Sequence, residues 1–228
     1  MKPELRHVGT SSSPVVVIDE FSGDVERIAQ LADELAPFPR ETDSYYPGVR
    51  GMIDEGQPEA FAFIQQTCSD AAQFIAGAFD VDGFELLRAS FSMVTMRPSE
   101  LRARQRVPHF DSTDQKYLAL LHYLRVPPDS GTAFYRQRST GIERVTEENV
   151  DTFVRTAQRD IAALSADSGY IQGSDQHFEQ IGAVEAVPDR LIIYQGSLLH
   201  SGIIPRNMNF SADPREGRLT ANLFVRAH

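Results

Sequence analysis

The stretch "VPHFDST", residues 107–113, places two potential metal ligands, His109 and Asp111, two positions apart. Side chains on a strand alternate between its faces, so an extended segment would point both of these side chains to the same side. Pro108 has no N–H to give to a neighbouring strand, which favours a position at a sheet edge or at the end of a strand. The segment therefore predicts a polar site at the border of a β-sheet.

A third candidate ligand, His200, lies in the later stretch "YQGSLLHSGII" between Gly196 and Gly202. Two imidazoles and one carboxylate on three corners of an octahedron bind Fe(II) and leave adjacent positions open for other molecules. A His-x-Asp pair also arises by chance, and either histidine could instead be a hydrogen-bonded core residue. Metal binding and a structural role both remain open on these residues alone.

The C-terminal stretch "GRLTANLFVRA" has one apolar and one polar face if it is a strand. The polar face carries Arg218, Thr220, Asn222 and Phe224. It could face solvent, as on any half-buried antiparallel strand. It could also face the interior of a barrel that binds an anion, because a guanidinium binds a carboxylate in two places and stays charged.

Short β-rich segments separated by Pro, Gly and Asp follow one another from residue 84 to the end, which is typical of a sandwich or barrel. We expect eight strands, in residues 84–98, 105–111, 116–124, 131–137, 178–187, 189–196, 198–204 and 218–227. A helical insertion of about residues 141–177 interrupts them, with a helix start near Thr146 and Glu147 or Glu148. The insertion could be a lid or a dimer contact.

The first 83 residues are expected to contribute a strand and helices that pack on this core. "PVVVIDEF" predicts a strand, and residues 23–35 predict an amphipathic helix that ends before Pro37 and Pro39. Residues 45–59 are rich in Gly and Pro and predict a loop, followed by a helix over residues 58–79. Residues 1–228 are therefore predicted to form one domain, mainly β with flanking helices.

Charge and cysteine content exclude several classes of protein. The net charge of −10 opposes binding to nucleic acid or to an anionic membrane, both of which need a basic surface. The single cysteine, Cys68, excludes an intrachain disulfide and fits a reducing compartment. No long apolar segment suggests a signal peptide or a membrane span, so we expect a cytoplasmic protein.

These motifs resemble those of the Fe(II)- and 2-oxoglutarate-dependent oxygenases. The fold of that family is the double-stranded β-helix, a cupin-like jelly roll. It carries a His-x-Asp motif, a distal His and a basic residue on the last strand. The match covers about residues 84–228. The runs "YYPGVRG", "PHFD", "GTAFYR" and "HSGIIP" are similar to a poorly characterised bacterial subgroup, and that likeness extends over nearly the whole chain.

The resemblance implies that His109, Asp111 and His200 hold Fe(II), and that Arg218 with Thr220 holds the distal carboxylate of 2-oxoglutarate. The spacing departs from the family, because Arg218 lies further behind the distal histidine than is usual. Arg206 lies nearer, but six strand residues would carry it roughly 20 Å away from His200. A turn-forming loop lets the last strand return opposite the metal, which favours Arg218.

The function that the resemblance implies is a dioxygenase that hydroxylates a C–H bond of a small molecule or of an amino-acid side chain. Tyr117 and Arg50 are candidate substrate contacts, and a homodimer is possible. One alternative is a non-catalytic jelly-roll module that binds a small ligand or carbohydrate. Another is a zinc hydrolase, which would also need a placed general base. His122, on an apolar strand face, is expected to be a packed core histidine.

Overall fold

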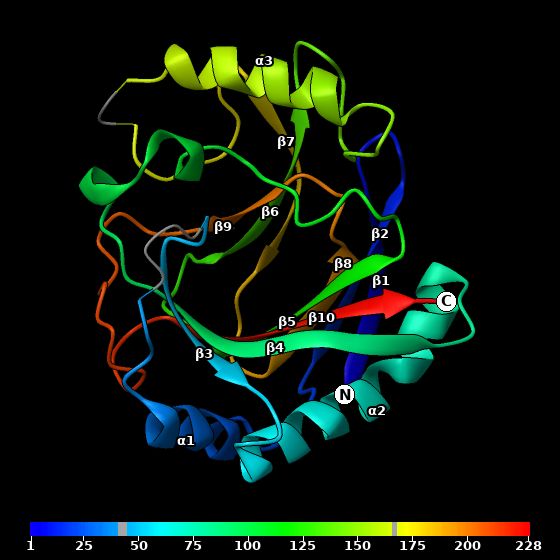
Figure 1. The fold of residues 1–228 in the computed structure, drawn as a ribbon, viewed down its shortest axis with the longest axis vertical. Helices are drawn as coiled ribbons and strands as arrows, with labels where there is room; N and C mark the ends of the chain where they lie inside the picture. The colour runs from blue at the N-terminus through cyan, green and yellow to red at the C-terminus, as the bar shows by residue number, and fades with distance from the viewer. Residues whose placement is uncertain (41–44, 166–167) are drawn as a thin grey trace.

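Two antiparallel sheets form the body of the molecule in the computed structural model, which describes residues 1–40, 45–165 and 168–228 (Figure 1). The larger sheet has the strand order β1-β2-β8-β5-β10-β4-β3, and the smaller sheet has the order β7-β6-β9. The strands are β1 Lys2–Val8, β2 Ser13–Asp19, β3 Gly48–Ile53, β4 Phe84–Val94, β5 Tyr117–Arg125, β6 Gly131–Gln137, β7 Phe178–Glu185, β8 Arg190–Gln195, β9 His200–Ile203 and β10 Leu219–Ala227.

Three α-helices lie outside the two sheets: α1 Val25–Leu35, α2 Pro58–Phe79 and α3 Val150–Ala162. The first two cover the outer face of the large sheet, whereas α3 lies at the opposite end, beyond the small sheet (Figure 1). Two short 3₁₀ turns, Pro98–Glu100 and Ala103–Gln105, follow β4. No helix in the described ranges combines the length and the apolar character that crossing a bilayer requires.

The strand order is that of a double-stranded β-helix. Strands β4, β10, β5 and β8 lie side by side in the large sheet, and β7, β6 and β9 face them. The segment around His109 takes the fourth place in the small sheet, because a single bridge joins His109 to His200 at the start of β9. The predicted fold class, mainly β with flanking helices, is confirmed.

Strand β10 shows how side-chain alternation builds two cores. Its apolar face packs beneath α1 and α2 in the main hydrophobic core, through Leu219, Ala221, Leu223 and Val225. Its other face points between the two sheets, where Phe224 joins a second apolar cluster from β5, β6 and β8. Of the two possibilities for the polar face, the interior of the roll is therefore the observed one.

Both predicted N-terminal helices form, and local chemistry sets their ends. The Asp24 side chain accepts a hydrogen bond from the Arg27 N–H at the start of α1, and the helix stops at Ala36, before Pro37. Helix α2 begins with Pro58, whose missing N–H costs nothing in the first turn. In the insertion, α3 is regular from Val150, and the turn before it starts at Thr146 as predicted: the Thr146 carbonyl accepts from the Val150 N–H at 2.9 Å, and the Asn149 side chain accepts from the Thr146 N–H at 2.9 Å.

Two strand predictions were wrong. Residues 105–111 do not form a continuous strand, since a 3₁₀ turn ends at Gln105 and Pro108 cannot donate to a ladder. Residues 48–53, expected in a loop, form β3. The glycines that suggested a loop are required by close packing, because a Cβ on Gly48 would lie 1.8 Å from the Met93 carbonyl oxygen and one on Gly51 would lie 2.6 Å from the Phe38 ring. The polar first residues also form a strand, β1, paired along its length with β2.

Candidate metal centre

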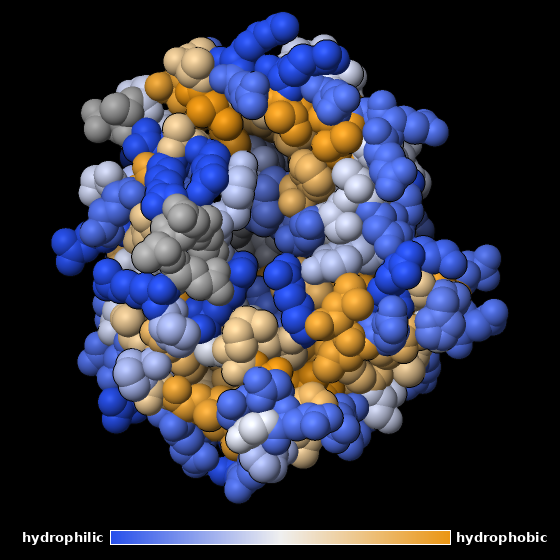
Figure 2. Space-filling model, in the orientation of Figure 1, coloured by the Kyte–Doolittle hydropathy of each residue, from blue (hydrophilic) through white to orange (hydrophobic). Residues whose placement is uncertain are grey.

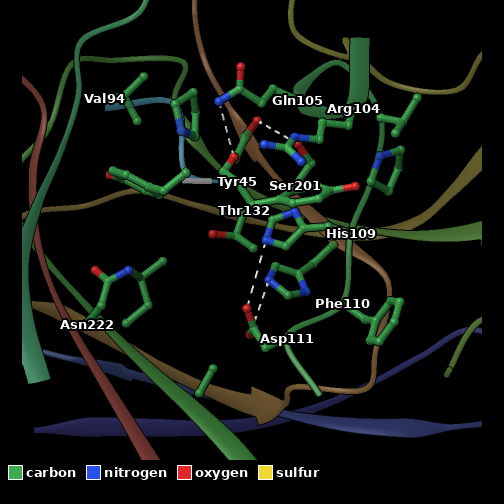
Figure 3. A pocket seen from close by; sticks show the side chains of 18 of the residues that line it. Tyr45, Val94, Arg104, Gln105, His109, Phe110, Asp111, Thr132, Ser201 and Asn222 are labelled. Carbon is green, nitrogen blue, oxygen red and sulfur yellow. Dashed lines mark hydrogen bonds and ion pairs between the residues drawn. The ribbon is translucent and has the colours of Figure 1, made fainter. Parts of the chain in front are cut away.

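His109, Asp111 and His200 converge at one end of the roll. Each offers one ligand atom, and these atoms lie within 4.8 Å of one another. Backbone hydrogen bonds hold the two histidines opposite each other: the His109 N–H donates to the His200 carbonyl at 2.9 Å, and the His200 N–H donates back at 2.8 Å. Figure 3 shows the Asp111 carboxylate facing the His109 ring, whose Nε2 lies 3.9 Å from Asp111 Oδ1. The sequence therefore predicted three side chains that the fold does bring together.

The His200 ring is oriented as a metal ligand requires. Its Nδ1 lies 2.8 Å from the Leu198 carbonyl oxygen, and since a carbonyl can only accept, Nδ1 carries the proton. The lone pair of the neutral ring is then on Nε2, which lies 3.5 Å from Asp111 Oδ2. A backbone carbonyl that fixes the tautomer in this way is the usual partner of a metal-binding histidine.

Asp111 is held in place by the backbone at Gly196. The Asp111 N–H donates to the Gly196 carbonyl at 2.7 Å. Gly196 has no room for a side chain, since a Cβ there would lie 2.5 Å from the Tyr117 ring and 3.2 Å from the Asp111 Cβ. A glycine at this position lets the two segments approach each other.

The electrostatics of the cluster favour a bound cation. Asp111 Oδ2 is buried and accepts no hydrogen bond from any residue that the structure describes. Burial raises the pKa of Asp111, although His200, Arg88 and Arg50 lower it in part. Burial also lowers the pKa of His109 well below its usual value, and His200 and Arg50 lower it further, so the ring is neutral with a free lone pair. The neutral His109 imidazole beside a buried carboxylate oxygen that accepts no hydrogen bond suits a divalent metal ion.

The cluster opens into a cavity of about 570 Å³ between the two sheets, and Arg218 and Thr220 line the same cavity. Arg218 is only 5% exposed, yet its Nε has no hydrogen-bond partner within the described ranges. Its guanidinium lies 5.8 Å from the centroid of the Tyr123 ring. Thr220 is fully buried and donates to Asn222 Oδ1 at 2.8 Å, which leaves the lone pairs of its hydroxyl free to accept. A buried guanidinium with an unused N–H suits an anionic ligand.

The two expected substrate contacts have different positions. Arg50, on β3, lines the cavity, and its guanidinium lies 4.3 Å from the centroid of the Tyr46 ring. Tyr117 is not among the lining residues of the described chain. Its ring lies next to Gly196, near the Asp111 Cβ, and 5.5 Å from the Phe224 ring between centroids. Its position fits support of the metal centre better than contact with a substrate.

Several lining residues were not predicted as site residues. Arg88 on β4 and Arg104 in the 3₁₀ turn line the cavity, and so do Phe153 and Ala157 of α3. Arg88 shares a strand face with Ser90, which made it a possible substrate contact in the sequence, although exposure at the surface explained it equally well. The residues from α3 have no such signal, because the path of the insertion depends on tertiary packing.

His122 does not belong to the site. It is fully buried, and its Nε2 lies 2.9 Å from Asp189 Oδ1. The Phe21 ring packs edge-on against its imidazole, with a centroid distance of 5.5 Å. The prediction of a packed core histidine is therefore confirmed.

Solved structures with a similar fold include enzymes that bind 2-oxoglutarate. AviO1 from Streptomyces viridochromogenes Tue57 is similar with a TM-score of 0.56 at 13% identity, over 97% of this chain and 90% of that chain. HygX from Streptomyces hygroscopicus, solved with nickel and 2-oxoglutarate bound, gives 0.51 at 16% identity, over 95% and 83%. The epimerase SnoN, in complex with Fe³⁺, alpha ketoglutarate and nogalamycin RO, gives 0.51 at 13% identity, over 94% and 79%. No curated protein matches the sequence.

The chain therefore has the double-stranded β-helix fold of the Fe(II)- and 2-oxoglutarate-dependent oxygenases, and the resemblance seen in the sequence is confirmed at the level of the fold. It belongs to the Family of unknown function (DUF6445), whose model matches residues 1–225.

Proposed function

We propose that this protein is an Fe(II)- and 2-oxoglutarate-dependent dioxygenase that hydroxylates a C–H bond of a small molecule or of an amino-acid side chain. The observation that carries the proposal is the convergence of His109, Asp111 and His200, with their ligand atoms within 4.8 Å of one another, at the wall of a cavity. The arrangement offers two imidazole nitrogens and one carboxylate oxygen, the donor set that non-haem Fe(II) oxygenases use.

In this proposal His109 and His200 hold iron through their Nε2 atoms, and Asp111 holds it through its carboxylate. The buried oxygen of Asp111 then gains the partner that it lacks among the described residues. The Leu198 carbonyl keeps the His200 ring in the metal-binding tautomer, and Gly196 keeps Asp111 beside it. The protein thus supplies a preformed site and does not need to rearrange its ligands.

Arg218 is the proposed partner of the distal carboxylate of 2-oxoglutarate, because it is a buried guanidinium of the cavity and its Nε–H is unused within the described chain. Thr220, two residues after Arg218 and within β10, lines the same cavity and can accept a hydrogen bond or reorient to donate one. Burial makes this charge pair stronger than it would be at the surface.

Bound iron and 2-oxoglutarate would use O₂ to put a hydroxyl group in place of a substrate hydrogen, while 2-oxoglutarate loses CO₂ and becomes succinate. The task of the chain is to orient the iron ligands, to neutralise the cosubstrate through Arg218 and to limit the access of water. The walls of the cavity, from both sheets and from α3, hold the substrate near the iron.

The cavity favours this function over hydrolysis by zinc. Asp111 is the only Asp or Glu among the lining residues that the structure describes, and His109 and His200 are the only histidines. All three are used as ligands, so these lining residues provide no separate general base to activate a water. A purely binding module would not need a buried carboxylate oxygen without a partner, which is costly unless a cation binds.

The test is anaerobic titration of the metal-free protein with Fe(II) and 2-oxoglutarate. We expect a weak visible charge-transfer band at one iron per chain and, after O₂ is admitted, slow conversion of 2-oxoglutarate to succinate. His109→Ala should abolish both signals. The control His7→Ala removes an exposed histidine of β1 and should leave both unchanged. Absence of the band in wild-type protein that contains iron would contradict the proposal.

A further inference from the structure

We infer that helix α3 of the insertion helps to position the metal ligands, with Phe153 as a positioning residue that acts through Phe110, the residue between His109 and Asp111. The inference rests on the proposed function and deepens it, since it gives the insertion a part in building the iron site. A lid or a dimer contact, the two roles that the sequence left open, would not require α3 to support a ligand.

The segment that carries His109 and Asp111 is held by the backbone along one edge. The His109 N–H and carbonyl exchange hydrogen bonds with His200, and the Asp111 N–H donates to the Gly196 carbonyl. All of these partners lie in β9 or in the turn before it. Hydrogen bonds along one edge leave the segment free to tilt about that edge, so packing on its faces decides the angle at which the two ligands point.

Phe110 supplies packing of this kind. Neighbouring side chains of an extended segment point to opposite sides, and Figure 3 shows the Phe110 ring pointing away from the Asp111 carboxylate. The ring meets that of Phe153 on α3 edge-on, with 5.7 Å between the centroids and an interplanar angle of 82°. A T-shaped aromatic pair has a preferred geometry, so this contact restricts the orientation of Phe110 as well as its distance from α3.

The same helix packs against the neighbour of the distal ligand. Leu199, next to His200, is fully buried in an apolar cluster that includes Phe153 and Ala157 of α3. Phe110 packs against this cluster too. Residues adjacent to both histidine ligands therefore share one hydrophobic cluster with the insertion.

Helix α3 is itself fixed to the small sheet. Asp160, near its C-terminal end, is 8% exposed and accepts a hydrogen bond at 3.2 Å from Gln137 Nε2 at the end of β6. The other oxygen of this carboxylate lies 3.0 Å from Nδ1 of His177, directly before β7. Because β6 pairs with β9 and Phe134 lies opposite His200, the strand that holds α3 also holds the distal ligand.

These contacts form a closed ring around the metal ligands. The ring runs from β6 through α3 to Phe110 and returns through the bridge between His109 and His200 to β9. Figure 2 shows hydrophobic side chains on the side of α3 that faces the molecule and hydrophilic ones on its outer side, as expected for a helix packed on a core. Groups behind a metal ligand set its orientation, so a change in α3 should reach the metal.

The test compares Phe153→Ala, Phe110→Ala and the double variant with wild type. The metal-free proteins are titrated anaerobically with Fe(II) and, separately, with Co(II), whose visible bands report the geometry of its ligands. We expect each single variant to bind Fe(II) about tenfold more weakly and to change the position or intensity of the Co(II) bands. Once Phe110→Ala has removed the contact, adding Phe153→Ala should weaken Fe(II) binding by less than about twofold more.

Phe21→Ala is the matched control, because Phe21 is a buried phenylalanine of the main core and not of the cluster beneath α3. It should lower thermal stability as Phe153→Ala does, yet leave Fe(II) affinity and the Co(II) bands unchanged. Phe153→Leu keeps an apolar side chain without the ring and should show a smaller loss of affinity in the same direction. It replaces Phe153→Ala in the comparison if the alanine variant does not fold.

Three results would overturn the inference. The first is a Phe153 variant that folds and binds Fe(II) as wild type does with unchanged Co(II) bands. The second is a double variant in which the losses of the two single variants multiply in full, since the two rings would then act separately. The third is a change of the same size in Phe21→Ala, which would show that any loss of core packing disturbs the site.

Wild-type protein separates this inference from the proposed function. If it binds iron and shows the charge-transfer band with 2-oxoglutarate while the Phe153 variants behave identically, only the role of α3 is rejected. If wild-type protein that contains iron shows no band, the oxygenase is rejected, and with it the role of Phe153 in positioning its ligands.

Discussion

The metal centre depends on residues that are not themselves ligands, and Gly196 is the clearest of them. Its carbonyl accepts from the Asp111 N–H, and its missing side chain makes room for both Asp111 and Tyr117. The position of the Asp111 carboxylate is therefore set by how closely these segments approach each other.

Replacing Gly196 by Ala tests this positioning role. The new Cβ would lie 2.5 Å from the Tyr117 ring, so the loop that carries Asp111 must move. We expect Fe(II) affinity to fall by about ten- to a hundredfold, as for other losses of support behind a metal ligand. The control Gly77→Ala, where an added Cβ meets nothing within 4 Å, should bind iron as wild type does. Equal affinity in both variants would show that Gly196 does not position the ligand.

Arg218 provides a second prediction at the residue scale. Arg218→Met removes the buried charge that would hold 2-oxoglutarate, and we expect its dissociation constant to rise on the order of a hundredfold, with iron affinity unchanged. The measurement is a titration of the charge-transfer band with 2-oxoglutarate in the Fe(II) protein. Arg226→Met, on the exposed face of the same strand, serves as the comparison. Weak binding of iron as well as of 2-oxoglutarate would point to a structural role instead.

At the scale of elements, Glu143 connects the β1–β2 turn to the chain that follows β6. The Glu143 carboxylate accepts hydrogen bonds from the backbone and hydroxyl groups of Thr10 and Ser11 and from the Arg136 guanidinium. Burial alone would raise the pKa of Glu143, but the hydrogen bonds from Ser11, Thr10 and Arg136 outweigh burial and lower it to about 2.

This carboxylate makes the stability of the fold depend on pH. Because the pKa of Glu143 is lower in the folded state, its contribution is complete above about pH 4.5 and is lost as the pH falls toward about 2. We expect Glu143→Gln to lower the free energy of unfolding by roughly 3 kcal/mol at neutral pH. Urea denaturation of both proteins should show this difference shrinking with acidity. Glu147→Gln, at an exposed position, should have no such effect, and a difference independent of pH would refute the assignment.

The elements also show which parts of the fold the sequence could predict. The helices over residues 25–35 and 58–79 were predictable, because their starts and stops depend on Asp24, Pro58 and Pro37 nearby in the chain. The strand β3 was not, because its glycines meet Met93 and Phe38, which do not adjoin them in sequence. The segment 105–111 was wrongly predicted as a strand, yet its two ligands still converge, since one bridge between His109 and His200 is enough to place them.

The distinction between features set by neighbouring residues and features set by distant ones applies to the site as well. Residue types and strand alternation made His109, Asp111, His200 and Arg218 candidates, and the resemblance to the oxygenase family assigned them their roles in the site. The insertion was expected as a possible lid, but the particular contacts that Gly196, Arg88 and α3 make could not be predicted, because they depend on how distant segments pack against each other. Tyr117 has the predicted proximity to the site but lies next to Gly196 rather than in the cavity.

At the scale of the whole molecule, the two sheets form one wall of the site and the helical insertion contributes another. Iron would join two distant parts of the chain, the segment before β5 and the start of β9, within the small sheet. A ligand that binds only the folded state stabilises that state by mass action.

Metal removal should therefore lower thermal stability. With Fe(II) and 2-oxoglutarate each at about a hundred times their dissociation constants, we expect the melting temperature to rise by about 10–20 °C, measured anaerobically by scanning calorimetry. A chelator should reverse the shift. His200→Ala should show no shift on addition of either ligand, whereas His7→Ala should respond as wild type does. A shift of the same size in His200→Ala would place the metal elsewhere.

Diffraction at the iron absorption edge from crystals grown anaerobically with Fe(II) and 2-oxoglutarate tests the central claim most directly. The account predicts one anomalous peak at bonding distance from His109 Nε2, His200 Nε2 and an Asp111 carboxylate oxygen, with 2-oxoglutarate extending from it to Arg218. A peak at another cluster, such as His122 with Asp189, or a loaded crystal with no peak between these three ligands, would contradict it.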